Sequence, residues 1–529
     1  MQTSDFFRSR IDAMIDLSDP LAVLATRLPW DQIEVALAPM FAHKDRAGQT
    51  NADVDLFGPN LALAGAGRSS AGRPRLPIRL MASLLYLKHS FNLSDEELTQ
   101  RWSENVLWQF FSGMDYYEHR LPCDATQIGR FRVLVGEAGL EQLLKATINT
   151  AVAIKAVKPQ DLERVIVDTT VQEKAIAHPV DSRLLEIARH KVVSAARRAG
   201  IALKQTFAKE GKTLRRQAGG YAHAKQFNRL KRVLKRQRTI LGVVMREVSA
   251  KCAAPGFITD KPTALAGLKM WLERAERIRT QQRHDKNKLY ALHAPEVECI
   301  GKGKARKPYE FGVKNAVVVS HQHGLMLGAR TFPGNPFDGH ILSAVLEQAT
   351  NLTQDLSVTI KQVVADLGFR GKAVDADNPG VQIIHRGRYK SLSKQERGWL
   401  KRRQAVEPAI GHLKSDHRLD RCWLMGTLGD ALHAISCAAG YNLRWLLRAV
   451  ARLAIGPVFL RLLQAALWAV QPKTGTYGAV GHRAAPTSSQ SRAPQRSPPT
   501  PWHRVGVCVI GLETKFAGPT KYTQLPATA

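Results

Sequence analysis

Residues 164–170 read Arg-Val-Ile-Val-Asp-Thr-Thr, and they form the clearest strand signal in the chain. Its β-branched apolar run favours a buried strand, and that run ends at an acid, Asp168. A second run, residues 362–366 (Gln-Val-Val-Ala-Asp), ends in the same way at Asp366. Two strands that each finish on a carboxylate predict an α/β fold with acids gathered at strand ends.

A third acid, Glu407, lies in a basic stretch. On an ideal helix Arg403, Glu407, Lys414 and Arg418 fall within one narrow stripe, which would surround the carboxylate with phosphate-binding cations. Pro408 fits best at a helix start, so the helix is expected to begin at Pro408 or to kink there. Arg403 then need not share the stripe, whereas Lys414 and Arg418 are expected to remain on the same face of the helix.

Two acids at strand ends and a third beside a helix can converge on divalent metal. Mg²⁺ prefers carboxylate oxygen and water, and two ions about 3.5–4 Å apart can activate an oxygen nucleophile and stabilise a leaving oxygen. Any one of these acids read alone is most simply an ordinary strand-end or surface carboxylate. The three contexts together favour a site for Mg²⁺ or Mn²⁺, with two ions, and phosphodiester chemistry on nucleic acid.

Composition favours a polyanionic partner. The net charge is +32, and the 529 residues with 44% hydrophobic content suffice for two or three domains. The N-terminus lacks a signal peptide, so a cytoplasmic, nucleoid-associated protein is expected. The apolar stretch 449–470 contains Arg452, Pro457 and Arg461, which favours an amphipathic or buried helix over a membrane span.

A zinc site is not expected from spacing. The six cysteines are scattered with no CxxC pair, which suits reduced thiols better than a disulfide scaffold or a zinc site. His412 and His417 are five residues apart and diverge on a helix. His321 and His323 lie on a turn with no acid or cysteine at ligand spacing.

Helical signals dominate residues 76–150, which follow an N-terminal helical segment and linker at 1–75. Pro77 suits the first turn of one helix, and Ser94 begins a capping box at the next. A third helix is expected to carry Arg130 and Arg132. Short helices with an Arg-bearing third member suit a helix-turn-helix-like reader of DNA, and a small helical bundle that only makes dimers remains the alternative.

Strand signals then alternate with helical ones. Strands are expected at 163–171, 296–300, 309–320, 325–331, 358–366 and 381–385, with a helix at 338–350. The order β-β-β-α-β-α, with acids on the first and fourth strands, is that of a ribonuclease H-like domain, a mixed sheet flanked by helices. This domain would comprise residues 160–182 and 291–455, interrupted by a helical insertion at 183–290.

The insertion is strongly basic. Residues 183–250 hold 18 Lys and Arg against 3 Asp and Glu. A charge run of this kind is often only a solvated helix face. Its one-sidedness favours a surface that tracks phosphates, with an affinity that falls steeply with salt.

The C-terminal part, residues 456–529, is expected to be a helix followed by a disordered tail. After residue 471 the chain turns to Pro, Ser, Thr, Gly and Arg. A short apolar stretch at 505–512 is a possible strand with no assigned role.

Over roughly residues 75–455 the sequence resembles the DDE transposases of bacterial insertion sequences, in the insertion-sequence-five group. The resemblance is carried by five motifs, at residues 167–174, 295–304 with 307–312, 365–371, 403–414 and 438–442. The signature of the group is Tyr-x2-Arg-x3-Glu-x6-Lys. Arg403, Glu407 and Lys414 match it at the right spacing, and Leu400 stands at the tyrosine position.

This resemblance implies that Asp168, Asp366 and Glu407 bind the catalytic metals. It also implies that Arg403 and Lys414 contact transposon-end DNA, and that the helical segment recognises terminal inverted repeats. The cations Arg418, Arg130, Arg132 and Lys372 are further candidates for DNA contact.

The expected protein is a transposase that binds the inverted repeats of its own element, cuts at the ends with water and joins the 3′ hydroxyls to target DNA. Assembly on two ends implies a homodimer or a larger synaptic complex, with no membrane partner. A DNA-binding relic or regulator of transposition would keep the basic helices and need no metal. A structure-specific nuclease of the same fold would cut and never join.

Overall fold

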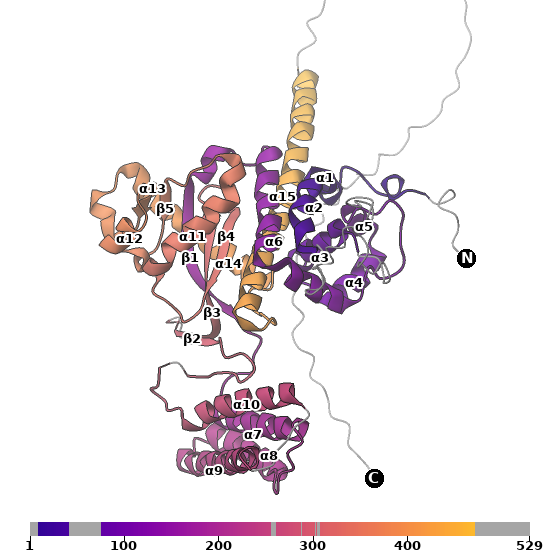
Figure 1. Cartoon of the computed structure of the whole chain (residues 1–529). Coiled ribbons are helices and arrows are strands. Elements are labelled where there is room, and N and C mark those ends of the chain that lie inside the picture. Colours follow the sequence, from indigo (N-terminus) through magenta and orange to yellow (C-terminus); the bar gives the residue numbers. More distant parts are fainter. Residues whose placement is uncertain are drawn as a thin grey trace, which may run out of the picture. The chain divides into compact units, whose positions relative to one another are not determined.

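The computed structural model describes residues 9–41, 76–254, 261–286, 288–301, 303 and 307–470, with side chains up to residue 453. Contacts divide the chain into two units, Met1–Ala465 and Ala466–Ala529. The first unit is a helix-rich mixed α/β structure built on one sheet. Figure 1 shows the labelled helices and strands.

The sheet has six strands and runs in the order β2-β3-β1-β5-β6, while β4 also pairs with β3. β3 is antiparallel to β1, β2 and β4, whereas β5 is parallel to both β1 and β6. β1 lies between β3 and β5, and its apolar residues Val165, Ile166 and Val167 are all buried. A continuous apolar run of this kind is typical of a strand covered on both faces. The strands are β1 (Arg164–Glu173), β2 (Glu298–Gly301), β3 (Tyr309–Ser320), β4 (Met326–Phe332), β5 (Gln362–Val364) and β6 (Gln382–Ile384).

These six strands confirm the expected strand positions, with two differences in length. β1 does not end at Asp168 but continues to Glu173. The strand expected at 358–366 forms only over Gln362–Val364, so Asp366 lies just beyond it. Asp366 keeps an extended backbone, with φ of −81° and ψ of 173°, as the N-cap of a short 3-10 helix.

Helices that flank the sheet follow the strands in the chain. α11 (Asp338–Thr353) connects β4 to β5 and packs on β4, and α14 (Val406–Ser415) packs on β1. α12 (Lys372–Ala376) lies between β5 and β6, and α13 (Lys394–Arg402) precedes α14. α15 (Gly426–Val470) closes the described chain.

The helical segment before the sheet confirms the expected helix starts. α3 begins directly after Pro77, and the hydroxyl of Ser94 accepts a hydrogen bond of 3.0 Å from the backbone N–H of Glu97. α6 is kinked at Gly136, which has a φ of +65°. The helices are α1 (Pro20–Arg27), α2 (Trp30–Leu37), α3 (Ile78–Ser90), α4 (Asp95–Glu104), α5 (Val106–Phe111) and α6 (Ala125–Ala153).

The insertion between β1 and β2 is a four-helix body. Its amphipathic helices bury aliphatic residues against one another and leave most of their cations in solvent. They are α7 (Asp181–Arg198), α8 (Ala208–His223), α9 (Phe227–Cys252) and α10 (Pro262–Thr280).

Buried apolar residues form two main cores. One runs continuously from α1 through α6 and the sheet to α15. The other is made only of residues between Leu184 and Leu292. The helical segment 76–150 and the sheet therefore share a core, while the insertion has its own.

No helix of the described residues is long and apolar enough to cross a membrane. The apolar stretch 449–470 belongs to α15, which confirms the helix expected there. The tail expected to be disordered, and the strand suggested at 505–512, lie outside the described residues.

Candidate active site

Asp168 lies in the middle of β1, which continues to Glu173, so the expectation that this strand ends at Asp168 was wrong. Asp366 lies two residues beyond the end of the neighbouring parallel strand β5. Ile166 of β1 pairs with Val364 of β5, and each acid follows two residues later. Neighbouring strands lie about 4.8 Å apart, and residues two apart along a strand share a face. The register therefore places Asp168 and Asp366 beside each other, where the parallel pairing of β1 and β5 stops.

Asp168 contacts the backbone of Thr169 and the guanidinium of Arg403. Its Oδ1 accepts a hydrogen bond of 2.8 Å from the backbone N–H of Thr169, and its Oδ2 lies 3.2 Å from Nη1 of Arg403. The side chains of Asp168 and Arg403 are each less than one-fifth exposed. A partly buried ion pair of this kind is screened less by salt than a surface pair.

Glu407 lies in the first turn of α14, and its side chain is 67% exposed. α13 ends at Arg402, a 3-10 turn covers residues 403–405, and α14 begins at Val406. Pro408 thus falls in a first turn, where its missing N–H leaves no helical hydrogen bond unmade. Arg403 precedes α14, yet its Nη2 still lies 4.0 Å from Oε1 of Glu407.

Arg403 consequently stands between two of the three predicted metal-binding acids. Among the described residues, the ligand oxygens of Asp168, Asp366 and Glu407 do not form a group with every pair within 4.8 Å. The donor set consists of carboxylate oxygens, which suits Mg²⁺ or Mn²⁺. A cation that binds Asp168 must compete with the guanidinium that now neutralises it.

Lys414 and Arg418 do not share a helical stripe, so that expectation was wrong. α14 ends at Ser415, and Arg418 adopts a left-handed backbone with φ of +72° in the turn that follows. The ammonium of Lys414 lies 3.3 Å from Oε2 of the buried Glu310 on β3. The guanidinium of Arg418 donates to the carbonyl of Asn92 at 3.0 Å.

The remaining predicted DNA-contact cations differ in exposure. Arg130 on α6 and Lys372 at the start of α12 face solvent. Arg132 is buried, and its Nη2 lies 3.3 Å from Oδ1 of Asp95. Of the two arginines on α6, Arg130 is therefore the one in position to meet a solvent-borne partner.

Leu400, at the position of the signature tyrosine, is a buried residue of α13. Its side chain belongs to the main apolar core. A leucine here supplies packing but no hydroxyl.

A buried ionic network lies at the far end of β1, and the sequence alone did not indicate it. The ammonium of Lys174 lies 2.8 Å from Oε1 of Glu296 and 2.7 Å from Oδ1 of Asp430. Burial opposes the charge on Lys174, but Asp430 and Glu296 raise its pKa overall. Lys174 closes the first motif and Glu296 belongs to the second, so these motif residues connect β1 to the start of α15.

Asn315 is a second polar residue that the sequence did not single out. It is fully buried on β3, opposite Thr170, and neither end of its amide has a hydrogen-bond partner. Because Thr170 follows Asp168 by two residues, Asn315 lies on the same face of the sheet as that acid.

The motif at residues 438–442 serves packing. Asn442 on α15 accepts from the backbone N–H of Met326 at 2.9 Å and donates to the carbonyl of the same residue at 2.9 Å. It also donates to Thr147 on α6 at 3.0 Å. A Cβ on Gly440 would lie 2.5 Å from Cβ of His89, so only glycine permits this approach of α3 and α15.

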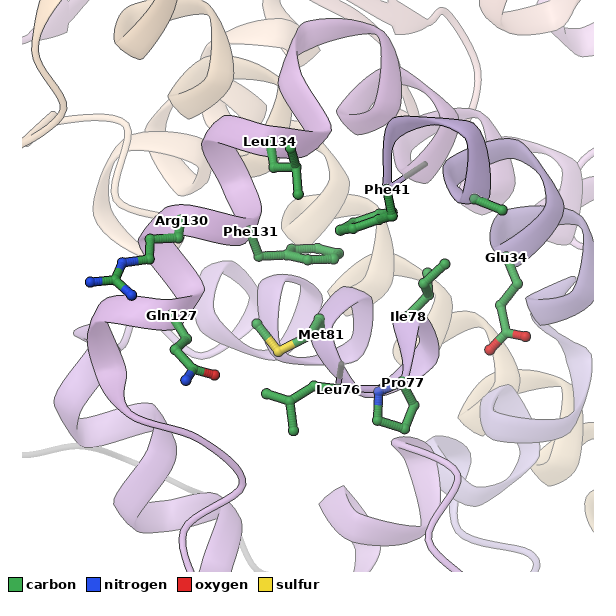
Figure 2. Close-up of a pocket in the computed structure, with 11 residues that line it drawn as sticks. Glu34, Phe41, Leu76, Pro77, Ile78, Met81, Gln127, Arg130, Phe131 and Leu134 are labelled. Carbon is green, nitrogen blue, oxygen red and sulfur yellow. The ribbon is translucent and has the colours of Figure 1, made fainter. Parts of the chain in front are cut away.

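An apolar pocket of about 680 Å³ lies among the N-terminal helices. Figure 2 shows Met81, Phe131 and Leu134 lining it, with Arg130 at its edge. None of the three acids contributes to it. Its lining suits packing or ligand binding rather than phosphodiester chemistry.

Comparisons with known proteins match two parts of the chain. Residues 55–134 match a transposase domain, DUF772, and residues 276–443 match a transposase DDE domain. The chain is similar to the uncharacterised protein ORF8 in the nfe locus of Rhizobium meliloti, with 39% identity over 224 residues. That alignment covers 42% of this chain and 95% of the other protein. No solved structure matches.

Proposed function

The chain belongs to the DDE transposases of insertion sequences, and we propose that it binds the terminal inverted repeats of its own element and catalyses metal-dependent cleavage and strand transfer there. The observation that carries the proposal is the position of Asp168 and Asp366 two residues beyond a parallel register pair. Glu407 is linked to Asp168 through Arg403. The motif spacing favours the insertion-sequence-five group.

We infer that the sheet is ribonuclease H-like. The sheet contains the strand order β4-β3-β1-β5-β6. β3 is antiparallel to both β4 and β1, whereas β5 is parallel to both β1 and β6. This order supports the inference, as do Asp168 on the first strand of the pattern and Asp366 just beyond the fourth. The helices α7 to α10 then form an insertion after the first strand.

Asp168 and Asp366 would share one Mg²⁺ or Mn²⁺ ion, and Glu407 would hold a second. Such ions, when bound, supply an activated oxygen nucleophile and stabilise the leaving oxygen. The role of Arg403 follows from its present contacts. It neutralises Asp168 while no cation is bound, and it would move to a DNA phosphate once the acids take up metal.

DNA contact is proposed for Arg403, Lys414, Arg418, Lys372 and Arg130. Lys414 would have to share its charge between Glu310 and phosphate, since it already pairs with that buried acid. The helical segment 76–150 would read the inverted repeats, and the exposed cations of α8 and α9 would track the backbone of the duplex. Two ends and a target require a dimer or a larger synaptic complex.

A strand-transfer assay tests this function. Purified chain, pre-cleaved end duplexes of its own element, a supercoiled plasmid and Mg²⁺ are incubated, with Asp366→Asn in parallel. Wild type is expected to give joined products, and Asp366→Asn is expected to lose cutting and joining while it keeps end binding. Normal cutting by Asp366→Asn would overturn the metal assignment.

A DNA-binding protein without catalysis is the second candidate function. Leu400 in place of the signature tyrosine favours it, because a buried leucine cannot supply the missing hydroxyl. Salt-sensitive end binding with no product from wild type would select this candidate. Cutting without any joined product would instead select a nuclease of the same fold.

A further inference from the structure

Three buried side chains that the proposed chemistry does not use converge between α3 and α15. One ring nitrogen each of His89 and His433 and the sulfur of Cys437 all lie within 4.8 Å of one another. The three side chains are buried. His89 is more than 340 residues from His433 and Cys437 in sequence, which explains why spacing alone predicted no zinc site.

The geometry of the cluster suits a tetrahedral metal. Sγ of Cys437 lies 3.5 Å from Nδ1 of His89. Bonds from zinc of about 2.3 Å to sulfur and about 2.0–2.1 Å to nitrogen, at a tetrahedral angle, place those two atoms about 3.5 Å apart. The same nitrogen of His89 lies 3.5 Å from the carbonyl oxygen of His417, so a metal at Nδ1 would replace that contact and its hydrogen. His433 and Cys437 are four residues apart on α15, so both project from one face of the helix.

A hydrogen bond to the backbone fixes the orientation of one ligand. Nε2 of His433 lies 2.8 Å from the carbonyl of Arg418. A carbonyl can only accept, so Nε2 carries the hydrogen and Nδ1 of His433 carries the lone pair. A histidine that gives one nitrogen to a carbonyl and keeps the other for a metal is the usual arrangement around zinc.

The protonation of the cluster also suits metal uptake. Burial lowers the pKa of His433 to about 3 and lowers that of His89, so both imidazoles are neutral at pH 7. Burial raises the pKa of Cys437, so without metal this residue is a thiol. Metal binding would release the thiol proton to solvent and create a sulfur–metal bond.

A cavity that adjoins the two histidines would give a metal access and room for a fourth ligand. It measures about 350 Å³ and is lined by both histidines together with Lys88, Asp95, Arg132 and Arg418. Asp95 pairs with Lys88 at 2.5 Å and with Arg132 at 3.3 Å. The cations disfavour a bare divalent ion, but a thiolate and a hydroxide or other small anion in the fourth position would neutralise it.

We propose that His89, His433 and Cys437 form a zinc site with three protein ligands, which fastens α3 of the helical segment to α15. This site would be separate from the Mg²⁺ acids, because nitrogen and sulfur ligands select zinc and carboxylates select magnesium. It would hold together the helices whose close approach Gly440 permits.

Metal content of the full-length chain tests the proposal directly. After dialysis without added metal, wild type is expected to retain about one zinc per chain. Cobalt added to stripped protein is expected to give the sulfur-to-cobalt absorption of a thiolate ligand. Cys123→Ser, which removes a buried thiol outside the cluster, should leave both readouts unchanged.

A hydrogen-bonded cluster without metal is the competing explanation, and Cys437→Ser separates the two. A serine hydroxyl can still donate to His89, but it is a poor zinc ligand. We expect Cys437→Ser and His433→Gln to lose the zinc and the cobalt band, and a chelator to lower the melting temperature of wild type only. Equal metal content in wild type and Cys437→Ser, or a wild type that binds neither zinc nor cobalt, would overturn the site.

Discussion

Arg403 is the residue on which the proposed chemistry of the acids depends, because its guanidinium lies 3.2 Å from Asp168 and 4.0 Å from Glu407. Replacement by glutamine removes a positive charge from the position that a divalent ion must approach. Arg403→Gln is therefore expected to bind Mn²⁺ severalfold more tightly in the absence of DNA, and to join ends poorly. Electron paramagnetic resonance titration of free Mn²⁺ measures the first effect.

Arg402→Gln is the matched control for this prediction. The guanidinium of Arg402 donates to the backbone carbonyls of His321 and Gln322 and touches neither acid. Its Mn²⁺ affinity is expected to equal that of wild type. Unchanged or weaker Mn²⁺ binding by Arg403→Gln would show that the guanidinium does not compete with metal.

Functional residues were predictable where neighbouring residues in the sequence mark them. Asp168 and Asp366 were found because each ends an apolar run, and Glu407 because of the spacing to Arg403 and Lys414. The pairing of Lys414 with Glu310 was not predictable, since 104 residues separate them. His89 and Cys437 likewise meet only through the packing of α3 on α15, which no spacing encodes.

Gly312 decides whether β3 can lie against β1. A Cβ at this position would lie 1.9 Å from the carbonyl oxygen of Gln172, a backbone atom that cannot move without breaking the pairing. Gly312→Ala is expected to lose about 3 kcal/mol of stability, at the upper end of overpacking costs. Thermal unfolding followed by circular dichroism gives the comparison with wild type.

Gly411→Ala provides the reference for Gly312→Ala. Gly411 lies in the interior of α14, and a Cβ there would meet nothing within 4 Å. Alanine in this helix should be neutral or stabilising, by about 0.5–1 kcal/mol. Equal melting temperatures for Gly312→Ala and wild type would contradict the close approach of the two strands.

The outer face of α9 carries the exposed cations Lys231, Arg232 and Lys235. If they meet DNA phosphates, replacing all three by glutamine should reduce the slope of log K against log salt by about 2–3, close to 0.9 for each lost phosphate contact. Fluorescence anisotropy with a duplex, over a series of salt concentrations, measures this slope. An unchanged slope would leave the basic run as a solvated helix face.

Lys361→Gln serves as the control for charge alone. Lys361 is exposed and its ammonium already pairs with Glu163 at 2.9 Å. Its loss should leave the slope within error of wild type.

The sequence predicted the positions of the strands and helices better than the residues at which they end. The six strands and the helix starts at Pro77 and Ser94 were expected from alternation and capping. The stripe of Lys414 and Arg418 failed because the chain turns at Ser415 into a left-handed residue, and no residue between them signals that stop. β5 ended early, at Val364, because an apolar run fixes burial and does not fix the number of paired residues.

At the scale of the whole molecule, the arrangement of cores separates one part from the rest. The core of the insertion draws only on residues between Leu184 and Leu292, whereas the main core joins the helical segment 76–150 to the sheet and to α15. The boundaries proposed from sequence at 150 and 160 therefore divide one packed core. The second core extends to Leu292, two residues beyond the boundary proposed at 290.

Because the insertion has its own core, we expect it to fold without the rest of the chain. A fragment of residues 178–294 keeps its whole apolar core and is expected to unfold in one cooperative transition. A fragment of residues 76–158 exposes the faces that α3 and α6 bury against the sheet and α15, and is expected to melt without cooperativity. Circular dichroism melts of both fragments make the comparison. A cooperative melt of 76–158 alone would mean that the shared core is dispensable to these helices, and that the contact of α3 with α15 forms between two prefolded bodies.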